Sequence, residues 1–246
     1  MREVVYGRQP VRETLRAGRR QVYKLRLAQG IKPTGIVGEI LSLARAAGVP
    51  VQAVDRQALD KLGDEANHQG LAAEVSAYPY IDLVDLLQAA KEAGEVPFLL
   101  LLDHIQDPQN LGSLLRSAEA AGVHGAILPE RRATGVTPAA VRASAGAAEH
   151  LAVAMVTNLV RTMESLKEQG IWLVGLEALP EAQLYTQADL TGPLGVVVGS
   201  EGQGLARLVR ERCDFLIRLP MYGRVESLNA GVAGAIALYE VRRQRK

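Results

Sequence analysis

The first 76 residues show apolar positions spaced as in short helices that alternate with short strands. The stretch from Gly7 to Ala17 is typical of a helix, with Pro10 in its first turn and Gly18 just after its end. Strands are predicted at residues 21–27, 49–54 and 71–77, and further helices at residues 36–47 and 55–62. This alternation predicts a small parallel or mixed sheet with helices packed against it.

Residues 77–95 differ in character from the segments on either side. They contain a proline, one short amphipathic helical stretch and a surplus of acidic residues. Such a stretch is typical of a connection between domains. We therefore expect an N-terminal domain over residues 1–76 and a larger C-terminal domain over residues 96–246.

The C-terminal segment opens with the continuous apolar run Phe98–Leu102, which is typical of a strand buried on both faces. Pro108 is predicted to start a helix that Gly122 ends. More strands are predicted at residues 126–128, 151–156, 171–176, 194–198 and 218–220, and more helices at residues 141–150, 158–169 and 229–243. The pattern predicts an open α/β sheet, in which ligands bind beyond the carboxyl ends of the strands.

The composition is that of a globular protein with one or two domains. The chain has 246 residues, of which 48% are hydrophobic and 22% charged, so a disordered, collagen-like or coiled-coil chain is excluded. No apolar run approaches the roughly 18 residues that span a bilayer, and we expect no membrane partner. The first residues lack the apolar core of a signal peptide, and Cys213 is the single cysteine. We therefore expect a reducing, cytoplasmic location.

The formal net charge is only +1, but it is unevenly distributed. Residues 1–32 hold nine basic and two acidic side chains. A basic end on a nearly neutral protein favours contact with a polyanion such as RNA or DNA. The alternative is a solvated helix face with spare arginines.

Three segments follow predicted strands and carry polar residues or glycines that a core does not need. The first reads DPQNLGSLLR from Asp107 to Arg116. Asn110 and Arg116 are its candidates for chemistry, although a capping asparagine and a surface arginine would explain them equally well.

The second segment, VVVGSEGQGL, runs from an apolar strand into Gly199, Glu201, Gly202 and Gly204. Glycines there let a ligand approach the backbone. Their spacing matches neither the dinucleotide fingerprint nor the phosphate-binding loop of nucleotide hydrolases. A tight turn between a strand and a helix is the alternative.

The third segment, LPMYGRVESLN, leaves a strand at Pro220 and enters the last helix near Ser227. Ser227 could simply cap that helix. The helix itself begins with small residues, which predicts close packing inside the fold or across a dimer.

The four histidines are scattered and lack the spacing of a metal site, so we expect no metal. His104 follows Asp103 at a strand end and could act as a base; a hydrogen-bonded structural histidine is the alternative. Cys213 is expected to be a buried small hydrophobic residue.

The three segments, in this order, resemble the three motifs of the SpoU-type RNA 2′-O-ribose methyltransferases of the knotted SPOUT class. The resemblance spans residues 98–240. Residues 1–76, with the turn His68-Gln69-Gly70, resemble the small RNA-binding domain of that family and are most similar to the bacterial 23S rRNA (guanosine-2′-O)-methyltransferases. The chain departs from the family pattern at Ala230-Gly231, where Val-Ser is usual, and at Glu226, an added acid.

The resemblance implies an α/β fold with a small N-terminal α/β RNA-binding domain and a C-terminal α/β SPOUT domain. That domain would hold a deep trefoil knot around residues 195–229. It further implies methyl transfer from S-adenosylmethionine to a ribose 2′-hydroxyl, with a guanosine of 23S rRNA as the favoured target, and a homodimer with the site near the subunit interface.

The resemblance also assigns roles to individual residues. Those implied to bind the cofactor are Gly199, Leu219, Met221, Ser227 and Leu228. Those implied to act in catalysis are Asn110, Arg116, Glu201, Ser227 and Asn229. Glu201 could hold Arg116 or lie near the positive sulfur. Because a guanidinium is a poor proton acceptor, we expect Arg116 to bind an RNA phosphate and to lower the pKa of the hydroxyl, with a phosphate oxygen or Glu201 accepting the proton. RNA contacts are expected from Arg8, Arg12, Arg16, Arg19 and Arg20.

Alternatives stay open at this point. The same chemistry could act on tRNA or on another rRNA site, because the catalytic motifs are shared. A non-catalytic RNA-binding protein of ribosome assembly could keep the fold. A nucleotide-dependent dehydrogenase is a remote third possibility, since the dinucleotide fingerprint is absent.

Overall fold

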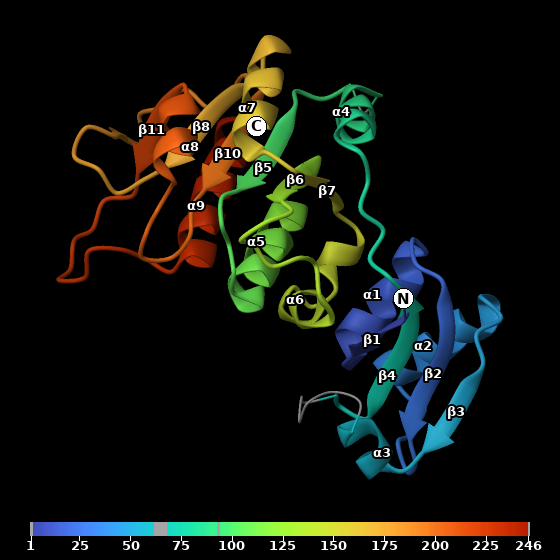
Figure 1. The fold of residues 1–246 in the computed structure, drawn as a ribbon. Helices are drawn as coiled ribbons and strands as arrows, with labels where there is room; N and C mark the ends of the chain where they lie inside the picture. Colours follow the sequence, from blue (N-terminus) through green and yellow to red (C-terminus); the bar gives the residue numbers. More distant parts are fainter. Residues whose placement is uncertain (1, 62–67, 93, 246) are drawn as a thin grey trace. The chain divides into compact units, whose positions relative to one another are not determined.

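The computed structural model describes residues 2–61, 68–92 and 94–245, and the chain divides into two compact units (Figure 1). The N-terminal unit comprises Met1–Pro79 together with Val136–His150. The C-terminal unit comprises Tyr80–Gly135 and Leu151–Lys246. The expected N-terminal region is therefore joined by a short segment from much later in the chain.

The N-terminal unit is built on a small mixed sheet. Its elements are β1 (Arg2–Tyr6), α1 (Arg8–Ala17), β2 (Val22–Ala28), α2 (Ile36–Ala46), β3 (Val51–Val54), α3 (Arg56–Asp60), β4 (Leu71–Ser76) and α6 (Pro138–Ala143). The strand order is β1-β4-β2-β3, with β2 and β3 parallel and β4 antiparallel to both of its neighbours. The mixed sheet confirms the prediction, although β1 was not predicted. The predicted end of the helix at residues 62–63 lies outside the described residues.

Residues 136–150 do not form the helix predicted over residues 141–150. Helix α6 ends at Ala143, Ala145 and Gly146 adopt left-handed backbone angles (φ of 53° and 90°), and a short 3-10 turn follows at Ala147–Glu149. A Cβ on Gly146 would lie 2.6 Å from Cβ of Glu13 in α1. The chain reverses here because this segment packs closely on α1.

Arg20 lies buried at the centre of this packing. Its guanidinium pairs with Glu3, donates through Nη1 to Oε1 of Glu149 at 3.2 Å, and donates through Nε to the carbonyl of Ser76 at 2.9 Å. Burial raises the pKa of Glu149, and the charge of Arg20 opposes that shift. The expectation that Arg20 contacts RNA is therefore wrong, because its side chain is fully removed from solvent.

We expect Arg20→Ala to lower the free energy of unfolding by about 3–5 kcal/mol, because it leaves the buried carboxylate of Glu149 and the partly buried one of Glu3 without this cation. Urea denaturation followed by circular dichroism measures this loss. Lys32→Ala is the matched control, since Lys32 is exposed, and it should stay within about 0.5 kcal/mol of the wild type. A loss below about 1 kcal/mol for Arg20→Ala would contradict the buried network.

The other N-terminal arginines are also engaged, but nearer the surface. Arg12 and Arg16 both pair with Glu13 and with Glu39 of α2. Hydrogen bonds from His150 and Arg12 outweigh the effect of burial and lower the pKa of Glu13. Part of the basic surplus of residues 1–32 is thus neutralised by Glu39, which lies later in the chain.

Arg8 and Arg19 bind backbone groups. Arg8 donates to the carbonyl of Gln69 at 3.3 Å, and Arg19 donates to the carbonyls of Glu149 at 3.3 Å and Pro79 at 3.2 Å. Partly exposed contacts of this kind contribute little to stability and can be exchanged for a phosphate. Arg8, Arg12, Arg16 and Arg19 therefore stay predictions as RNA contacts.

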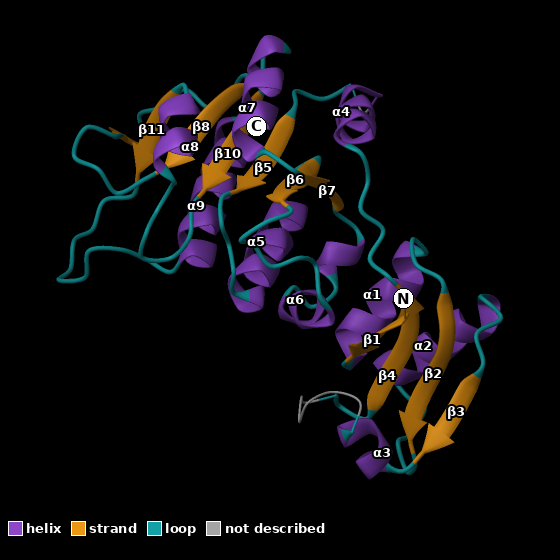
Figure 2. Ribbon diagram, viewed as in Figure 1, coloured by secondary structure: helices purple, strands orange, loops and turns teal. Residues whose placement is uncertain are grey.

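The C-terminal unit contains a larger, wholly parallel sheet (Figure 2). Its elements are α4 (Leu83–Glu92), β5 (Phe98–Leu102), α5 (Pro108–Ala120), β6 (Gly125–Pro129), β7 (Ala152–Val156), α7 (Leu159–Glu168), β8 (Trp172–Leu176), β9 (Gln183–Leu184), β10 (Leu194–Val198), α8 (Arg207–Arg212), β11 (Phe215–Arg218) and α9 (Ala230–Gln244). In the described residues seven strands pair in the order β7-β6-β5-β10-β8-β11-β9. This confirms the predicted open α/β sheet.

Helices cover both faces of this sheet (Figure 2). On one face, α4, α7 and α8 bury leucines and valines against the strands in a single apolar cluster. On the other face, α9 packs against α5 at its small residues. A Cβ on Gly231 would lie 2.9 Å from Cβ of Ser113, and one on Gly234 would lie 2.3 Å from Cδ2 of Leu114. The small residues of α9, including the departure at Gly231, are thus used for packing inside this unit.

The strand order decides where the loops meet. Strand β10 lies between β5 and β8, and Val198 is in register with Leu102 on one side and Leu176 on the other. The segments after these three strands therefore leave the sheet side by side. The knotted threading of residues 195–229 stays a prediction. None of the helices in the described part of the chain has the length and apolarity that crossing a bilayer requires.

Candidate functional site

A cavity of about 340 Å³ opens at the carboxyl edge of the parallel sheet. Its walls come from the end of β8, the glycine-rich loop after β10, the segment after β11 and the first turn of α9. All five residues expected to bind a cofactor lie in its wall: Gly199, Leu219, Met221, Ser227 and Leu228. The structure thus brings together segments that are about 30 residues apart in the sequence.

The glycine-rich loop folds back on itself. The amide of Gly204 donates to the carbonyl of Ser200 at 3.0 Å. A Cβ on Gly199 would lie 2.2 Å from the carbonyl carbon of Gly204, so no side chain fits at this position. Gly204 itself has a left-handed φ of 65°. Gly199 is therefore required for the closure of the loop, and its nearest neighbour is the loop's own backbone.

Two carboxylates hold the far end of this loop. Glu177, at the end of β8, accepts a hydrogen bond from the amide of Leu205 at 2.9 Å. Asp103, at the end of β5, accepts one from the amide of Ala206 at 2.7 Å and is fully buried. Sequence reasoning assigned no such role to either residue, although both are acids that directly follow an apolar strand.

A cluster of one carboxylate and two amides lies beside the cavity. Glu201 Oε2 accepts from Nδ2 of Asn110 at 2.9 Å and from Nδ2 of Asn229 at 3.1 Å. Nδ2 of Asn229 also donates to Oδ1 of Asn110 at 2.7 Å. Three of the predicted catalytic residues, one from each motif, therefore contact one another directly.

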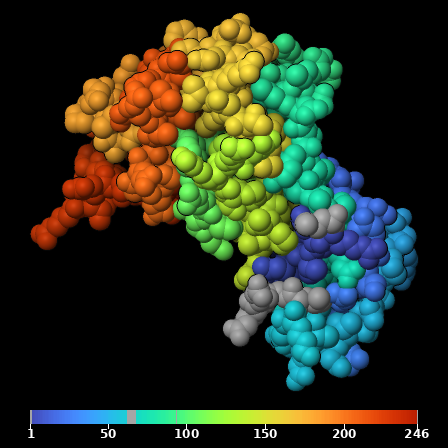
Figure 3. Space-filling view, in the orientation of Figure 1, coloured from blue at the N-terminus to red at the C-terminus, as the bar shows by residue number. Residues whose placement is uncertain are grey.

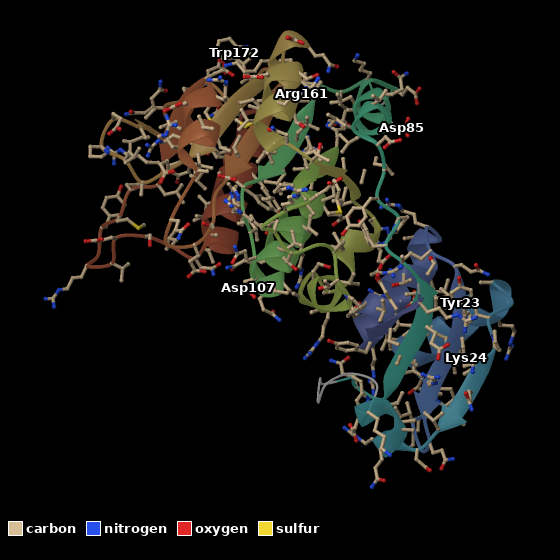
Figure 4. All side chains as sticks on the ribbon, in the orientation of Figure 1. Tyr23, Lys24, Asp85, Asp107, Arg161 and Trp172 are labelled. Atoms are coloured by element: carbon tan, nitrogen blue, oxygen red, sulfur yellow. The ribbon has the colours of Figure 1, made fainter. Side chains whose placement is uncertain are left out.

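Both asparagines are fixed at the starts of helices. Asn229 caps α9, its Oδ1 accepting from the amides of Gly231 and Val232 at 3.0 and 3.3 Å. Asn110 stands in the first turn of α5, where Asp107 is the capping residue (labelled in Figure 4). The alternative of Asn110 as a simple cap is thus wrong, because Asp107 fills that position.

Arg116 does not join this cluster. It is exposed on α5, six residues beyond Asn110, and it lines neither the cavity nor its rim. The expectation that Glu201 holds Arg116 is wrong for one chain, since the hydrogen bonds of Glu201 within the described residues go to Asn110 and Asn229. A six-residue step turns the side chain about 240° around a helix, which places it on another face.

The cavity suits a ligand that carries both cationic and apolar groups. Three carboxylates line it, from Glu177, Glu201 and Glu226. The apolar part of the wall comes from Leu219, Met221 and Leu228. The segment between β11 and α9 stands out from the surface in Figure 3, and Tyr222 within it is 94% exposed.

Metal-ligating side chains and the single thiol can each be described from the structure. Within residues 2–61, 68–92 and 94–245, no group of three or more histidine, cysteine or acidic side chains could hold a metal ion. Burial raises the pKa of the Cys213 thiol to about 12. A thiol with that pKa is a poor nucleophile at neutral pH.

Both parts of the chain match known families. Residues 97–239 match the SpoU rRNA Methylase family, and residues 4–81 match the family described as RNA 2′-O ribose methyltransferase substrate binding. The chain is 47% identical over 243 residues to YacO of Bacillus subtilis, whose name assigns it to the TrmH family of tRNA/rRNA methyltransferases. That alignment covers 99% of this chain and 96% of YacO.

Solved structures share the fold. The SpoU methyltransferase AviRb from Streptomyces viridochromogenes, in complex with the cofactor AdoMet, superposes with a TM-score of 0.81 at 27% sequence identity. The match covers 99% of this chain and 90% of the AviRb chain. An AdoMet-bound rRNA methyltransferase from Sinorhizobium meliloti gives a TM-score of 0.79 at 25% identity, over 98% of this chain and 87% of its own.

Proposed function

The chain belongs to the SpoU rRNA methylase family of RNA 2′-O-ribose methyltransferases, and from this premise we propose that it methylates a guanosine of 23S rRNA. The observation that carries the proposal is the contact of Glu201, Asn110 and Asn229 at the rim of the cavity. The N-terminal region supports the choice of RNA, because residues 4–81 match a family described as substrate binding.

S-adenosylmethionine is the cofactor that the cavity fits. The carboxylates of Glu177, Glu201 and Glu226 suit its positive sulfur and ammonium groups, and the apolar wall suits adenine. Two similar solved structures hold AdoMet. When bound, the cofactor supplies an electrophilic methyl carbon, whose bond to sulfur breaks, with the electron pair left on sulfur, as the bond to the ribose oxygen forms.

The residues of this chain position the two reactants. Backbone groups at Leu219 and Leu228 would bind the adenine edge, and Met221 would cover its face. Ser227 and the cluster of Glu201, Asn110 and Asn229 orient the ribose against the methyl carbon. Positioning of this kind supplies much of the rate of a bimolecular transfer. Oε1 of Glu201 makes no hydrogen bond within the described residues, and it accepts the hydroxyl proton.

We further propose that the enzyme is a homodimer in which Arg116 acts at the site of the partner subunit. Arg116 is exposed in the single chain, away from its own cavity. Its guanidinium would bind a phosphate beside the acceptor ribose and stabilise the developing negative charge on the hydroxyl oxygen. The pKa of a guanidinium is too high for it to take the proton itself.

A complementation experiment tests this arrangement. Arg116→Ala and Glu201→Ala should each be inactive alone. Unfolding and refolding them together produces mixed dimers, in which one site has Arg116 from one chain and Glu201 from the other. We expect recovery of about a quarter of the wild-type activity, since half of the dimers are mixed and each has one complete site. No recovery would place both residues in the same chain's site.

The target itself is tested with methyl-labelled S-adenosylmethionine, unmodified rRNA and tRNA, and complete digestion to nucleosides. We expect label in 2′-O-methylguanosine from 23S rRNA alone. Label in tRNA or in another nucleoside would overturn the target and leave the reaction unchanged. Cofactor binding without any labelled RNA would overturn the proposed function in favour of an RNA-binding role.

The contribution of the N-terminal unit to RNA affinity is tested with point variants of Arg8, Arg12 and Arg16. Truncation is unsuitable, because residues 136–150 pack in that unit.

A further inference from the structure

A second cavity, of about 690 Å³, lies against the first. The two share one wall, formed by the glycine-rich loop at Ser200, Glu201, Gln203 and Gly204. The opposite wall of this second cavity, which we call the groove, comes from the segment after β5, the segment after β6 and the start of α8. Its polar side chains there are His104, Gln106, Asp107, Asn110, Arg132 and Arg207. Asn110 and Glu201 act in the proposed reaction, whereas the other polar side chains of this space have no role in it.

Two residues of the groove have an uncommon backbone conformation. His104 and Arg132 have φ values of 57° and 58°, in the left-handed region that residues other than glycine rarely adopt. Hydrogen bonds hold the two segments together: the amide of Thr134 donates to the carbonyl of Ile105 at 2.8 Å, and Nε2 of Gln106 reaches the carbonyl of Arg132 at 3.5 Å. Strained residues of this kind gather at functional sites, where they fix the direction of a side chain.

His104 is held by a buried carboxylate. Its Nδ1 is hydrogen-bonded to Oδ1 of Asp103, whose other oxygen accepts the amide of Ala206. Nε2 of His104 makes no hydrogen bond within the described residues, and the side chain is 36% exposed. One ring nitrogen is thus fixed by the protein while the other is free to bind a ligand.

The charges of the groove favour an anion. Arg132 is exposed and forms no ion pair in the described part of the chain. Arg207 pairs with Glu211 alone, four residues along the same helix, and its side chain is 70% exposed. An exposed pair of this kind opens at little cost.

The two carboxylates of the groove already accept hydrogen bonds from other groups of the protein. Asp107 accepts from the amides of Gln109 and Asn110, and Glu201 accepts from two asparagine side chains. Apart from Oε1 of Glu201, the cations are therefore the charged groups that stay available to a ligand.

We propose that the groove holds the RNA strand on either side of the acceptor nucleotide, with Arg132 and Arg207 bound to its phosphates and His104 hydrogen-bonded to it through Nε2. This inference rests on the proposed function and names the contacts by which that site takes its substrate. The shared wall brings the strand to the cavity of the methyl donor. Guanidinium groups suit phosphate because they donate two parallel hydrogen bonds. The side-chain amide of Gln203, which makes no hydrogen bond within the described residues, is available to the edges of unpaired bases.

The test compares Arg132→Ala, Arg207→Ala and the double variant with the wild type. Each single change should raise KM for RNA about tenfold, with kcat within about twofold and an unchanged dissociation constant for S-adenosylmethionine. Binding to a labelled RNA oligonucleotide is also measured as a function of salt. The slope of the logarithm of the binding constant against the logarithm of the salt concentration should become shallower by about one unit for each lost phosphate contact. Arg161→Ala is the matched control, because Arg161 is also exposed but lies on α7, far from Asp107 in Figure 4.

His104 is tested separately, because its backbone conformation must be kept. His104→Gly relieves the strain and removes the ring, whereas His104→Asn tolerates the same backbone and keeps a hydrogen-bonding group. We expect KM for RNA to rise about fivefold for glycine and to recover in part for asparagine. A purely structural role would lower the melting temperature and leave KM unchanged in both.

The outcomes separate this inference from the proposed function. An unchanged KM and salt slope in the double arginine variant would overturn the groove as the RNA site, even if the wild type methylates rRNA. A parallel rise in the dissociation constant for S-adenosylmethionine would assign the arginines to the cofactor and overturn the inference as well. If no RNA is methylated by the wild type, the proposed function fails, while the oligonucleotide binding still decides the role of the groove.

Discussion

Gly199→Ala should weaken the binding of S-adenosylmethionine by a factor of about 10 to 100. The added Cβ would lie 2.2 Å from the carbonyl carbon of Gly204 and 2.5 Å from the amide nitrogen of Leu205. Both are backbone atoms, which cannot rotate away as a side chain can. The loop must open to admit the methyl group, which moves the wall of the cofactor cavity. Overpacking of this kind costs about 1–3 kcal/mol, and each 1.4 kcal/mol is about tenfold in affinity.

Isothermal titration calorimetry measures the affinity, and the melting temperature shows that the variant is folded. Gly192→Ala is the matched control, because a Cβ at Gly192 meets no atom within 4 Å and its φ is not left-handed. The control should bind the cofactor as the wild type does. Wild-type affinity in Gly199→Ala would mean that the closed loop does not shape the cofactor site.

Asn110→Ala should lower kcat by about 100-fold while the affinity for S-adenosylmethionine stays within about twofold. Asn110 does not line the cofactor cavity, but it donates to Glu201 and accepts from Asn229. Its loss frees the carboxylate and one amide to move. A displacement of about 1 Å between reacting groups can cost about 100-fold in rate.

Single-turnover methylation with saturating cofactor separates this effect from product release. Gln109→Ala is the control on the same turn of α5, since the side chain of Gln109 is exposed and makes no hydrogen bond in the described residues. Asn110→Asp keeps the shape but loses the donor and places two carboxylates together, so it should be as slow as Asn110→Ala. Near-wild-type turnover in Asn110→Asp would show that the hydrogen bond to Glu201 does not position the reactants.

Local sequence signals placed most of the secondary structure of the C-terminal unit. Five apolar residues in a row identified β5, because a strand buried on both faces has no polar positions. Pro108 marked the start of α5. The prediction failed at residues 141–150, where small residues suited a helix but packing against α1 required a reversal at Gly146.

The sequence by itself determined the composition of the site, through the resemblance of its three motifs to a known family. Each motif follows a strand, and the carboxyl ends of parallel strands share one edge of a sheet, which favours a common place for Asn110, Glu201 and Asn229. The charge of a residue and its place after a strand are local properties, and local properties are readable without the fold.

Only the tertiary structure decided which of the predicted polar side chains can reach a ligand and which are held by the protein itself. Arg20 is as basic as its neighbours in sequence, yet it is buried between Glu3 and Glu149, the second of which is 129 residues away. Arg116 belongs to the same motif as Asn110, yet the turn of α5 removes it from the cavity. Asp103 and Glu177 fix the glycine-rich loop through amides of Ala206 and Leu205. Burial and long-range pairing depend on which distant segments meet, and no local pattern contains that information.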